Sequence, residues 1–152
     1  MFHKYRLSIF AVLLTNILML PNSAFAAAPV YTSYFSDVAA SGYDVVSYFT
    51  KQQPLKGHSK FSTDYKGAEW HFSSQENLNL FKSDPKKYAP QYGGYCAWAA
   101  AYNKTAKGDP LQWAIHNGKL YLNYNADIKA KWVADKDSLI KKADVYWPSL
   151  IN

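Results

Sequence analysis

The chain has a single cysteine, Cys96, so no disulfide can form within it. Glycine and proline are modest as well, with 7 of each among 152 residues, which excludes collagen-like and low-complexity chains. Cohesion must therefore come from a hydrophobic core, to which the aromatic residues, 17% of the chain, can contribute much of the buried area. A chain of this length predicts one domain.

Runs of like charge are also absent. The 17 Lys and Arg residues exceed the 11 Asp and Glu residues by a net +6, but they are scattered along the chain. Because nucleic-acid binders usually gather their basic residues into a patch, we expect no nucleic-acid partner. The Gly-x-Ser-x-Gly, phosphate-loop, dinucleotide and His-Glu-x-x-His motifs are missing too, which points away from an enzyme without excluding one.

The first 26 residues have the pattern of a secretory signal peptide. Lys4 and Arg6 precede an apolar stretch at 7–20, and the small residues Ala24 and Ala26 frame a cleavage site. The apolar stretch is shorter than the roughly 20 residues that a spanning helix needs, which favours a cleaved signal peptide over the alternative of an uncleaved anchor. No second apolar stretch follows, and we expect an exported protein, periplasmic or secreted, with no membrane span after cleavage.

Strands are predicted where β-branched and aromatic residues concentrate, at 42–49, 60–64 and 68–72. In the last of these, alternation should turn Trp70 and Phe72 toward the core and leave His71 toward solvent.

A hairpin over 111–124 is the clearest local prediction, because Asn117-Gly118 suits a two-residue turn. Pairing outward from the turn matches Trp113 with Leu122. One face is then apolar and should be buried, whereas the other, with Gln112 and Asn123, should be exposed. The predicted buried face comprises Leu111, Trp113, Ile115, Leu120, Leu122 and Tyr124.

Helix-start signals follow the strands. Ser73 with Glu76 forms a capping-box pattern before an apolar stripe, and Asp84-Pro85 starts a second short helix. From Asn125 a long amphipathic helix should run until Pro148 ends it. The fold class is therefore a small single-domain α+β protein of short antiparallel strands, short helices and a long C-terminal helix. Its expected parts are a signal peptide at 1–26, a lead-in at 27–39 and the domain at 40–152.

Five segments in a fixed order resemble the YHS domain, a small module also found attached to heavy-metal pumps. The resemblance covers about residues 40–147, and its later segments look like the exported, stand-alone branch of that family. The segments are Gly42–Phe49, Lys66–Ser74, Phe81–Tyr88, Tyr92–Trp98 and Gly118–Tyr124.

The resemblance implies metal handling, because metal-linked YHS modules carry cysteines at three places. In this chain those places hold Ser47, Ser73 and Asn77. Thiolate is the soft ligand that binds Cu(I) and Zn(II), and neither serine nor asparagine replaces it. The resemblance therefore predicts the fold more strongly than it predicts a metal.

A copper or zinc ion would have to use the ligands that remain, and we take Cys96, His58 and His71 as the candidates. His116, beside the hairpin turn, is expected to be a solvated turn residue. Cys96 could start a helix, whose dipole would favour the thiolate, or it could be a small buried hydrophobic residue.

Three functions stay open at this point. We expect an exported, non-enzymatic YHS-type binding module, with a role in envelope metal homeostasis as the resemblance implies. The alternatives are a thiol-dependent enzyme or redox protein that uses Cys96, and an envelope interaction domain without metal. Its partner would be an envelope protein or a small ligand.

Overall fold

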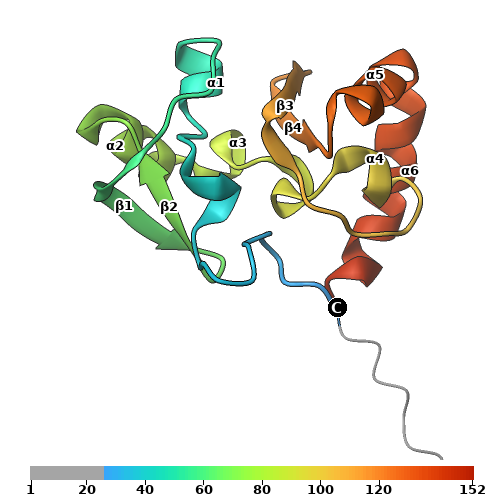
Figure 1. Cartoon of the computed structure of the whole chain (residues 1–152), viewed down its shortest axis with the longest axis horizontal. Helices are drawn as coiled ribbons and strands as arrows, with labels where there is room; N and C mark the ends of the chain where they lie inside the picture. The colour runs from blue at the N-terminus through green and yellow to red at the C-terminus, as the bar shows by residue number, and fades with distance from the viewer. Residues whose placement is uncertain (1–25) are drawn as a thin grey trace, which may run out of the picture.

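Two antiparallel strand pairs, set apart and joined by short helices, organise the chain in this computed structural model (Figure 1). The structure describes residues 26–152, so the predicted signal peptide lies, up to residue 25, outside the described residues. The mixture of helices and short antiparallel strands, with a long helix at the C-terminal end, confirms the predicted α+β class. Within residues 26–152, no helix is long and apolar enough to cross a membrane.

The first strand pair consists of β1 (His58–Tyr65) and β2 (Ala68–Phe72). Lys66 and Gly67, both with positive φ, make the turn between them. Trp70 and Phe72 are buried on the face that the alternation predicted. The predicted strands at 60–64 and 68–72 are therefore confirmed, and the first begins two residues earlier than expected.

The strand predicted at 42–49 is wrong. A short 3-10 turn, η1 (Ala39–Gly42), is followed by one bridge between Tyr43 and Lys56 and then by a helical turn, α1 (Ser47–Thr50). The cause is Asp44, whose Oδ1 accepts hydrogen bonds from the backbone N–H groups of Val46 and Ser47, as an N-cap does. This local capture overrides the β propensity of the two valines.

Two short helices follow the first strand pair. Helix α2 (Gln75–Ser83) is capped by Ser74, whose side chain accepts from the Asn77 N–H, one residue later than the predicted cap at Ser73. Helix α3 (Pro85–Tyr88) starts as predicted, with the Asp84 side chain accepting from the Lys87 N–H.

The second strand pair is the predicted hairpin, β3 (Asp109–His116) and β4 (Lys119–Asn123). Its register is confirmed at four positions. These are Trp113 with Leu122, Ala114 with Tyr121, Ile115 with Leu120 and His116 with Lys119.

The prediction that only one face of this hairpin is buried is wrong. Leu120 and Leu122 are buried as expected, but Tyr121 and Asn123, on the opposite face, are also buried. Leu111 and Tyr124, at the ends of the predicted apolar face, are exposed instead. The reason is a second core behind the hairpin, formed by residues far away in the sequence.

That second core lies between the hairpin and the C-terminal helices. A 3-10 turn, η2 (Gln91–Gly94), and helix α4 (Ala97–Ala100) precede the hairpin, and α5 (Ala126–Ala134) and α6 (Lys136–Leu150) follow it. Trp132 and Leu139 are buried here, as expected for the apolar face of the predicted amphipathic helix.

The predicted continuous helix from Asn125 is interrupted at Asp135, which has non-helical φ and ψ of −141° and 37° and separates α5 from α6. Asn125 caps α5, because its side chain accepts from the Ile128 N–H. Pro148 does not end the helix as predicted but lies inside its last turn, where its missing N–H leaves the carbonyl of Asp144 without a helical hydrogen bond.

The predicted lead-in is fastened to the rest of the fold. The Ala27 N–H donates to Leu150 O at 2.8 Å, and the Tyr31 N–H donates to Gly93 O at 2.9 Å. Val30, between these bonds, is buried in the first core, the cluster of apolar side chains that includes Trp70 and Phe72. The two described ends of the chain therefore lie side by side, at the bottom of the view in Figure 1.

Candidate functional site

A buried carboxylate organises the first half of the fold. Asp44 is fully buried, and its two oxygens accept five hydrogen bonds. Oδ1 accepts from the Val46 and Ser47 N–H groups at 2.9 and 3.3 Å. Oδ2 accepts from Ser73 N at 2.8 Å, Ser73 Oγ at 2.6 Å and Asn77 Nδ2 at 2.7 Å. A buried charge with this many donors is stabilised by its surroundings.

Ser47 belongs to the same network through its hydroxyl. Its Oγ lies 2.7 Å from Asp44 O and 2.8 Å from Gln53 O, and it accepts from the Leu55 N–H at 3.2 Å. The hydroxyl therefore ties the α1 turn to the loop that leads into β1. We call Asp44, Ser47, Ser73 and Asn77 the Asp44 network.

Three of the partners of Asp44, namely Ser47, Ser73 and Asn77, lie at the places where the resemblance implies cysteines. The fold thus brings Ser47, Ser73 and Asn77 together, from α1, the end of β2 and α2. Their hydrogens are directed at one carboxylate and at backbone oxygens, so these groups do not fit a Cu(I) or Zn(II) centre that needs thiolates. These three positions therefore hold a hydrogen-bonded network.

The predicted metal ligands are spread over the two halves of the molecule. His58 is exposed at the start of β1, opposite Phe72, and His71 lies in β2. Cys96 lies at the start of α4 in the other half. Within residues 26–152, no three or more His, Cys, Asp and Glu side chains are grouped as metal ligands, so the three candidates share no common site.

Cys96 is buried, with 1% of its surface exposed. Burial raises the pKa of its thiol, and nearby backbone N–H groups, foremost that of Ala99, oppose this shift without reversing it. The helix that it caps has four residues, too few for a strong dipole. Its Sγ lies 4.0 Å from Asn123 Oδ1, a carbonyl-type oxygen that cannot act as a base toward it in the way a histidine would.

Asn123 is a buried residue of this region, although the sequence analysis predicted that it would be exposed. Its Oδ1 accepts from the Trp98 N–H at 3.3 Å and thereby holds the start of α4 against β4. Its Nδ2 is buried without a hydrogen-bond partner among the described residues. Only the burial of both faces of the hairpin places this amide inside, and local alternation could not show that.

His71 lines a groove of about 440 Å³ that is bounded by β2, η1 and the lead-in. Polar and apolar groups both line the groove, with serine hydroxyls and Lys56 among the polar ones. The lining residues are Tyr31, Ser33, Ser36, Val38, Ser41, Gly42, Lys56, Gly57 and His71. The His71 Nε2 lies 3.1 Å from Glu69 Oε1, close enough for an ion pair but without hydrogen-bond geometry. This nitrogen is buried and has no hydrogen-bond partner among the described residues. A buried polar atom without a partner is uncommon and marks a position where a ligand could supply one.

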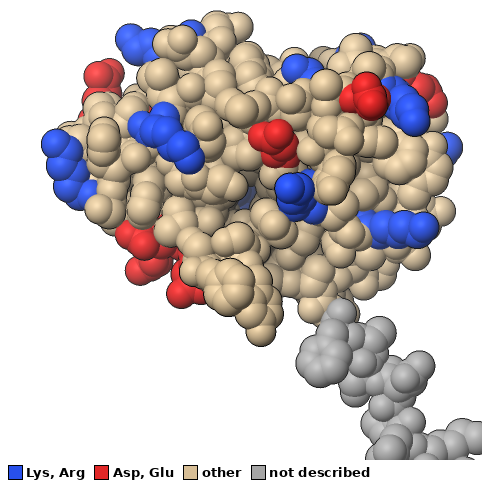
Figure 2. Space-filling view, viewed as in Figure 1, with Lys and Arg blue, Asp and Glu red and all other residues tan. Residues whose placement is uncertain are grey.

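The first strand pair, the short helices packed on it and the groove form a small α+β module, and the face seen in Figure 2 carries scattered charged side chains of both signs. Residues 46–92 of the chain match the family model of the YHS domain, so this chain contains a YHS domain. No curated protein and no solved structure matches the chain.

The matched segment contains Ser47, Ser73, Asn77 and His71, whereas Asp44 itself lies two residues before it. Cys96 and the β3–β4 hairpin lie beyond its end. Of the three predicted metal ligands, His58 and His71 are therefore in the YHS segment.

Proposed function

We propose that the chain is an exported, non-enzymatic binding module of YHS type, with the groove at His71 as its ligand site. The supporting observation is the pairing of a satisfied Asp44 network with an unsatisfied His71 nitrogen. The hydrogen-bonding capacity of the network is used inside the fold, and that of His71 is not.

The environment of Cys96 argues against a thiol-dependent enzyme or redox protein. Such a protein needs an accessible thiol with a lowered pKa. Cys96 is buried, and its pKa is shifted in the opposite direction.

In a role in envelope metal homeostasis, the metal ion would be bound by a histidine imidazole rather than by a cysteine thiolate. His71 with the Glu69 carboxylate offers two ligands, which is too few for tight binding of copper or zinc. We therefore expect at most one weakly bound ion, held at His71.

Titration with Zn(II) and with Cu(I), each against a competing chelator, tests this proposal. We expect His71→Gln to abolish any binding, and His58→Gln and Cys96→Ser to leave it unchanged. Tight binding that disappears in Cys96→Ser would contradict the proposal and restore the thiol-centred site.

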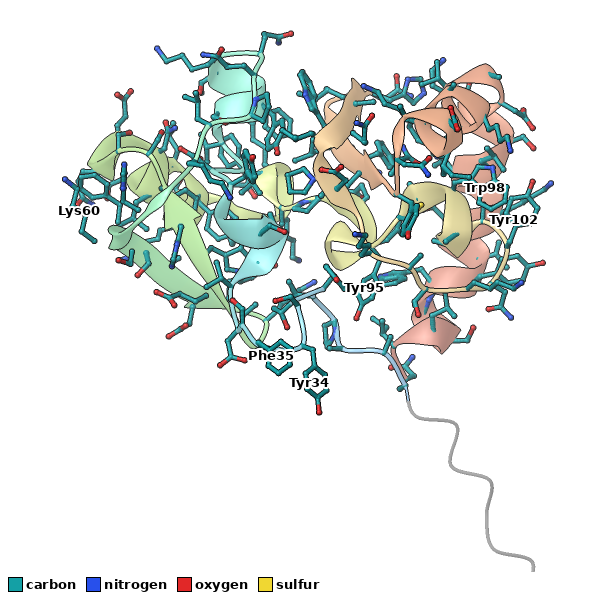
Figure 3. All side chains as sticks on the ribbon, viewed as in Figure 1. Tyr34, Phe35, Lys60, Tyr95, Trp98 and Tyr102 are labelled. Atoms are coloured by element: carbon teal, nitrogen blue, oxygen red, sulfur yellow. The ribbon has the colours of Figure 1, made fainter. Side chains whose placement is uncertain are left out.

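Interaction with an envelope protein is the second candidate, because two aromatic side chains project into solvent. Tyr34 and Phe35 are 93% and 94% exposed, and their rings pack edge to face with centroids 4.9 Å apart. Figure 3 shows both pointing away from the body of the molecule, below the first strand pair. Exposed aromatic pairs of this kind are typical anchors of interfaces.

The double substitution Tyr34→Ser/Phe35→Ser tests the second candidate, with Tyr102→Ser, another exposed aromatic, as the matched control. Cross-linking in the envelope should lose a defined partner in the double variant and keep it in the control. An unchanged cross-linking pattern would argue against an interface at this pair.

A further inference from the structure

A second hollow, distinct from the groove at His71, lies between the two halves of the molecule. Its volume is about 300 Å³, the lower limit of typical small-molecule sites. The β1–β2 turn contributes one wall, α6 contributes the other, and η2 forms the floor. We call it the slot. Its principal apolar lining residues are Tyr65, Trp70, Trp147, Pro90, Pro148 and Val30.

The lead-in closes one side of the slot. Gly93 has a φ of +60°, and a Cβ at this position would lie 2.0 Å from Pro29 O, so the backbone of the lead-in is in direct contact with η2. The Tyr31 N–H bond to Gly93 O holds this contact, and the Ala27 bond to Leu150 fastens the segment to the end of α6. The wall is thus fixed at both of its ends.

The floor contains a residue in an uncommon backbone conformation. Tyr92 has a φ of 54° and a ψ of 35°, in the left-handed region that non-glycine residues rarely adopt. Such residues persist where the surroundings hold them and occur often at ligand sites. Here the Tyr92 side chain packs on Trp147, with ring centroids 5.7 Å apart, and donates its hydroxyl to Asp144 Oδ1 at 2.9 Å.

The charges around the slot favour an anion. Lys66 and Lys86 line it, and neither forms a salt bridge within residues 26–152. Asp144 is the acidic residue of the lining, and its carboxylate accepts the Tyr92 hydroxyl. Burial, together with this hydrogen bond, raises the pKa of Tyr92 far above its usual value, so the hydroxyl stays protonated and keeps donating to Asp144. The lining thus carries two ammonium groups against one carboxylate, and the Lys66 Nζ lies over the Tyr65 ring, 5.6 Å from its centroid.

We propose that the slot binds a small aromatic anion, with its ring between Trp147 and Tyr65 and its negative group toward Lys66 and Lys86. Aromatic walls on both sides suit a planar ring, because offset and edge-to-face packing are favourable. The two lysines orient the ring and select for negative charge. This site is separate from the groove at His71, so it does not depend on the proposed function.

Three probes with the same indole ring and different charge test the proposal: indole-3-acetate, indole-3-acetamide and tryptamine. Ligand-observed NMR and calorimetry on the processed protein should show indole-3-acetate binding most tightly and tryptamine most weakly. The indole N–H resonances of Trp147 and Trp70 should shift on binding, which would locate the ligand in the slot.

The double variant Lys66→Gln/Lys86→Gln should weaken binding of indole-3-acetate by about tenfold. Both lysines are exposed, so the variant should fold, and circular dichroism checks this. Lys82→Gln/Lys104→Gln, which removes two exposed lysines outside the slot lining, is the matched control and should bind as the wild type does.

Three results would overturn the proposal. One is equal binding of the three probes, and another is unchanged affinity in Lys66→Gln/Lys86→Gln. The third is the absence of any binding of indole-3-acetate up to about 10 mM.

Discussion

The side-chain amide of Asn77 donates to the Oδ2 of Asp44 across 2.7 Å and joins helix α2 to the turn before α1. Both residues are buried, and 32 residues of chain, the whole β1–β2 pair among them, separate them in the sequence. Together with Ser73 this bond fixes how the first strand pair sits on the helices around it. Asn77, at a position where the resemblance implies a cysteine, is here a structural hydrogen-bond donor.

Removing the Asp44 carboxylate should destabilise the protein strongly. Asp44→Ala leaves the Ser73 and Asn77 donors buried without an acceptor, and breaking such a network costs about 3–5 kcal/mol of unfolding free energy. Denaturant unfolding measures this change. Asp64→Ala, an exposed aspartate on β1, is the control and should stay within about 0.5 kcal/mol. Equal effects of the two substitutions would contradict the role given to Asp44.

Asn123→Ala should cost about 1–3 kcal/mol, because the buried Trp98 N–H loses its acceptor. Gln112→Ala, on the same face of the hairpin but only half-buried, should change the unfolding free energy by about 0.5 kcal/mol or less. Urea unfolding curves of the two variants give the comparison. The reverse order would mean that Asn123 faces solvent, as alternation along the strand predicted.

Gly93→Ala should be far more destabilising than Gly67→Ala. Both glycines have positive φ, so both alanines are strained. A Cβ at 93 would also meet Pro29 O, whereas a Cβ at 67 would meet nothing within 4 Å. The difference between the melting temperatures of the two variants therefore measures how much the contact between the lead-in and Gly93 contributes to stability. Equal losses would mean that the lead-in does not lie on Gly93.

Buried tyrosines should make stability fall at high pH. Burial raises the pKa of Tyr121 to about 12 and that of Tyr48 still higher. The folded state then holds protons that the unfolded state loses near pH 10, so this contribution is complete below pH 10 and is lost as pH rises toward the folded values. Tyrosinate absorbance and denaturant unfolding between about pH 9 and pH 12 should show these tyrosines ionising only as the protein unfolds. Ionisation of all tyrosines near pH 10 in the folded state would contradict this burial.

The local features of the fold were predictable because their causes are local. Asn117-Gly118 determines the hairpin register, and Asp84-Pro85 starts α3, as the sequence indicated. The strand expected at 42–49 failed because a side chain of that same segment, Asp44, captures the backbone in a turn. That aspartate is stabilised by Ser73 and Asn77, which are remote in sequence.

The burial of the candidate site residues was harder to predict. Asn123 is inside because Trp132 and Leu139, brought back by α5 and α6, build a core behind the hairpin. The same packing buries Cys96 and separates it from His71. The spacing of residues along the chain does not predict the burial of Asn123 or of Cys96, because both result from contacts between segments that are distant in sequence.

The central claim is that Ser47, Ser73 and Asn77, at the three places where the resemblance to metal-linked YHS modules implies cysteines, serve the Asp44 network and bind no copper or zinc. Native mass spectrometry of the protein, purified without chelators, tests it most directly, with Cys96→Ser measured in parallel. The account predicts that the wild-type protein retains no copper or zinc that depends on the thiol, so that any retained metal is the same in both proteins. Stoichiometric copper or zinc in the wild type that is lost in Cys96→Ser would contradict it.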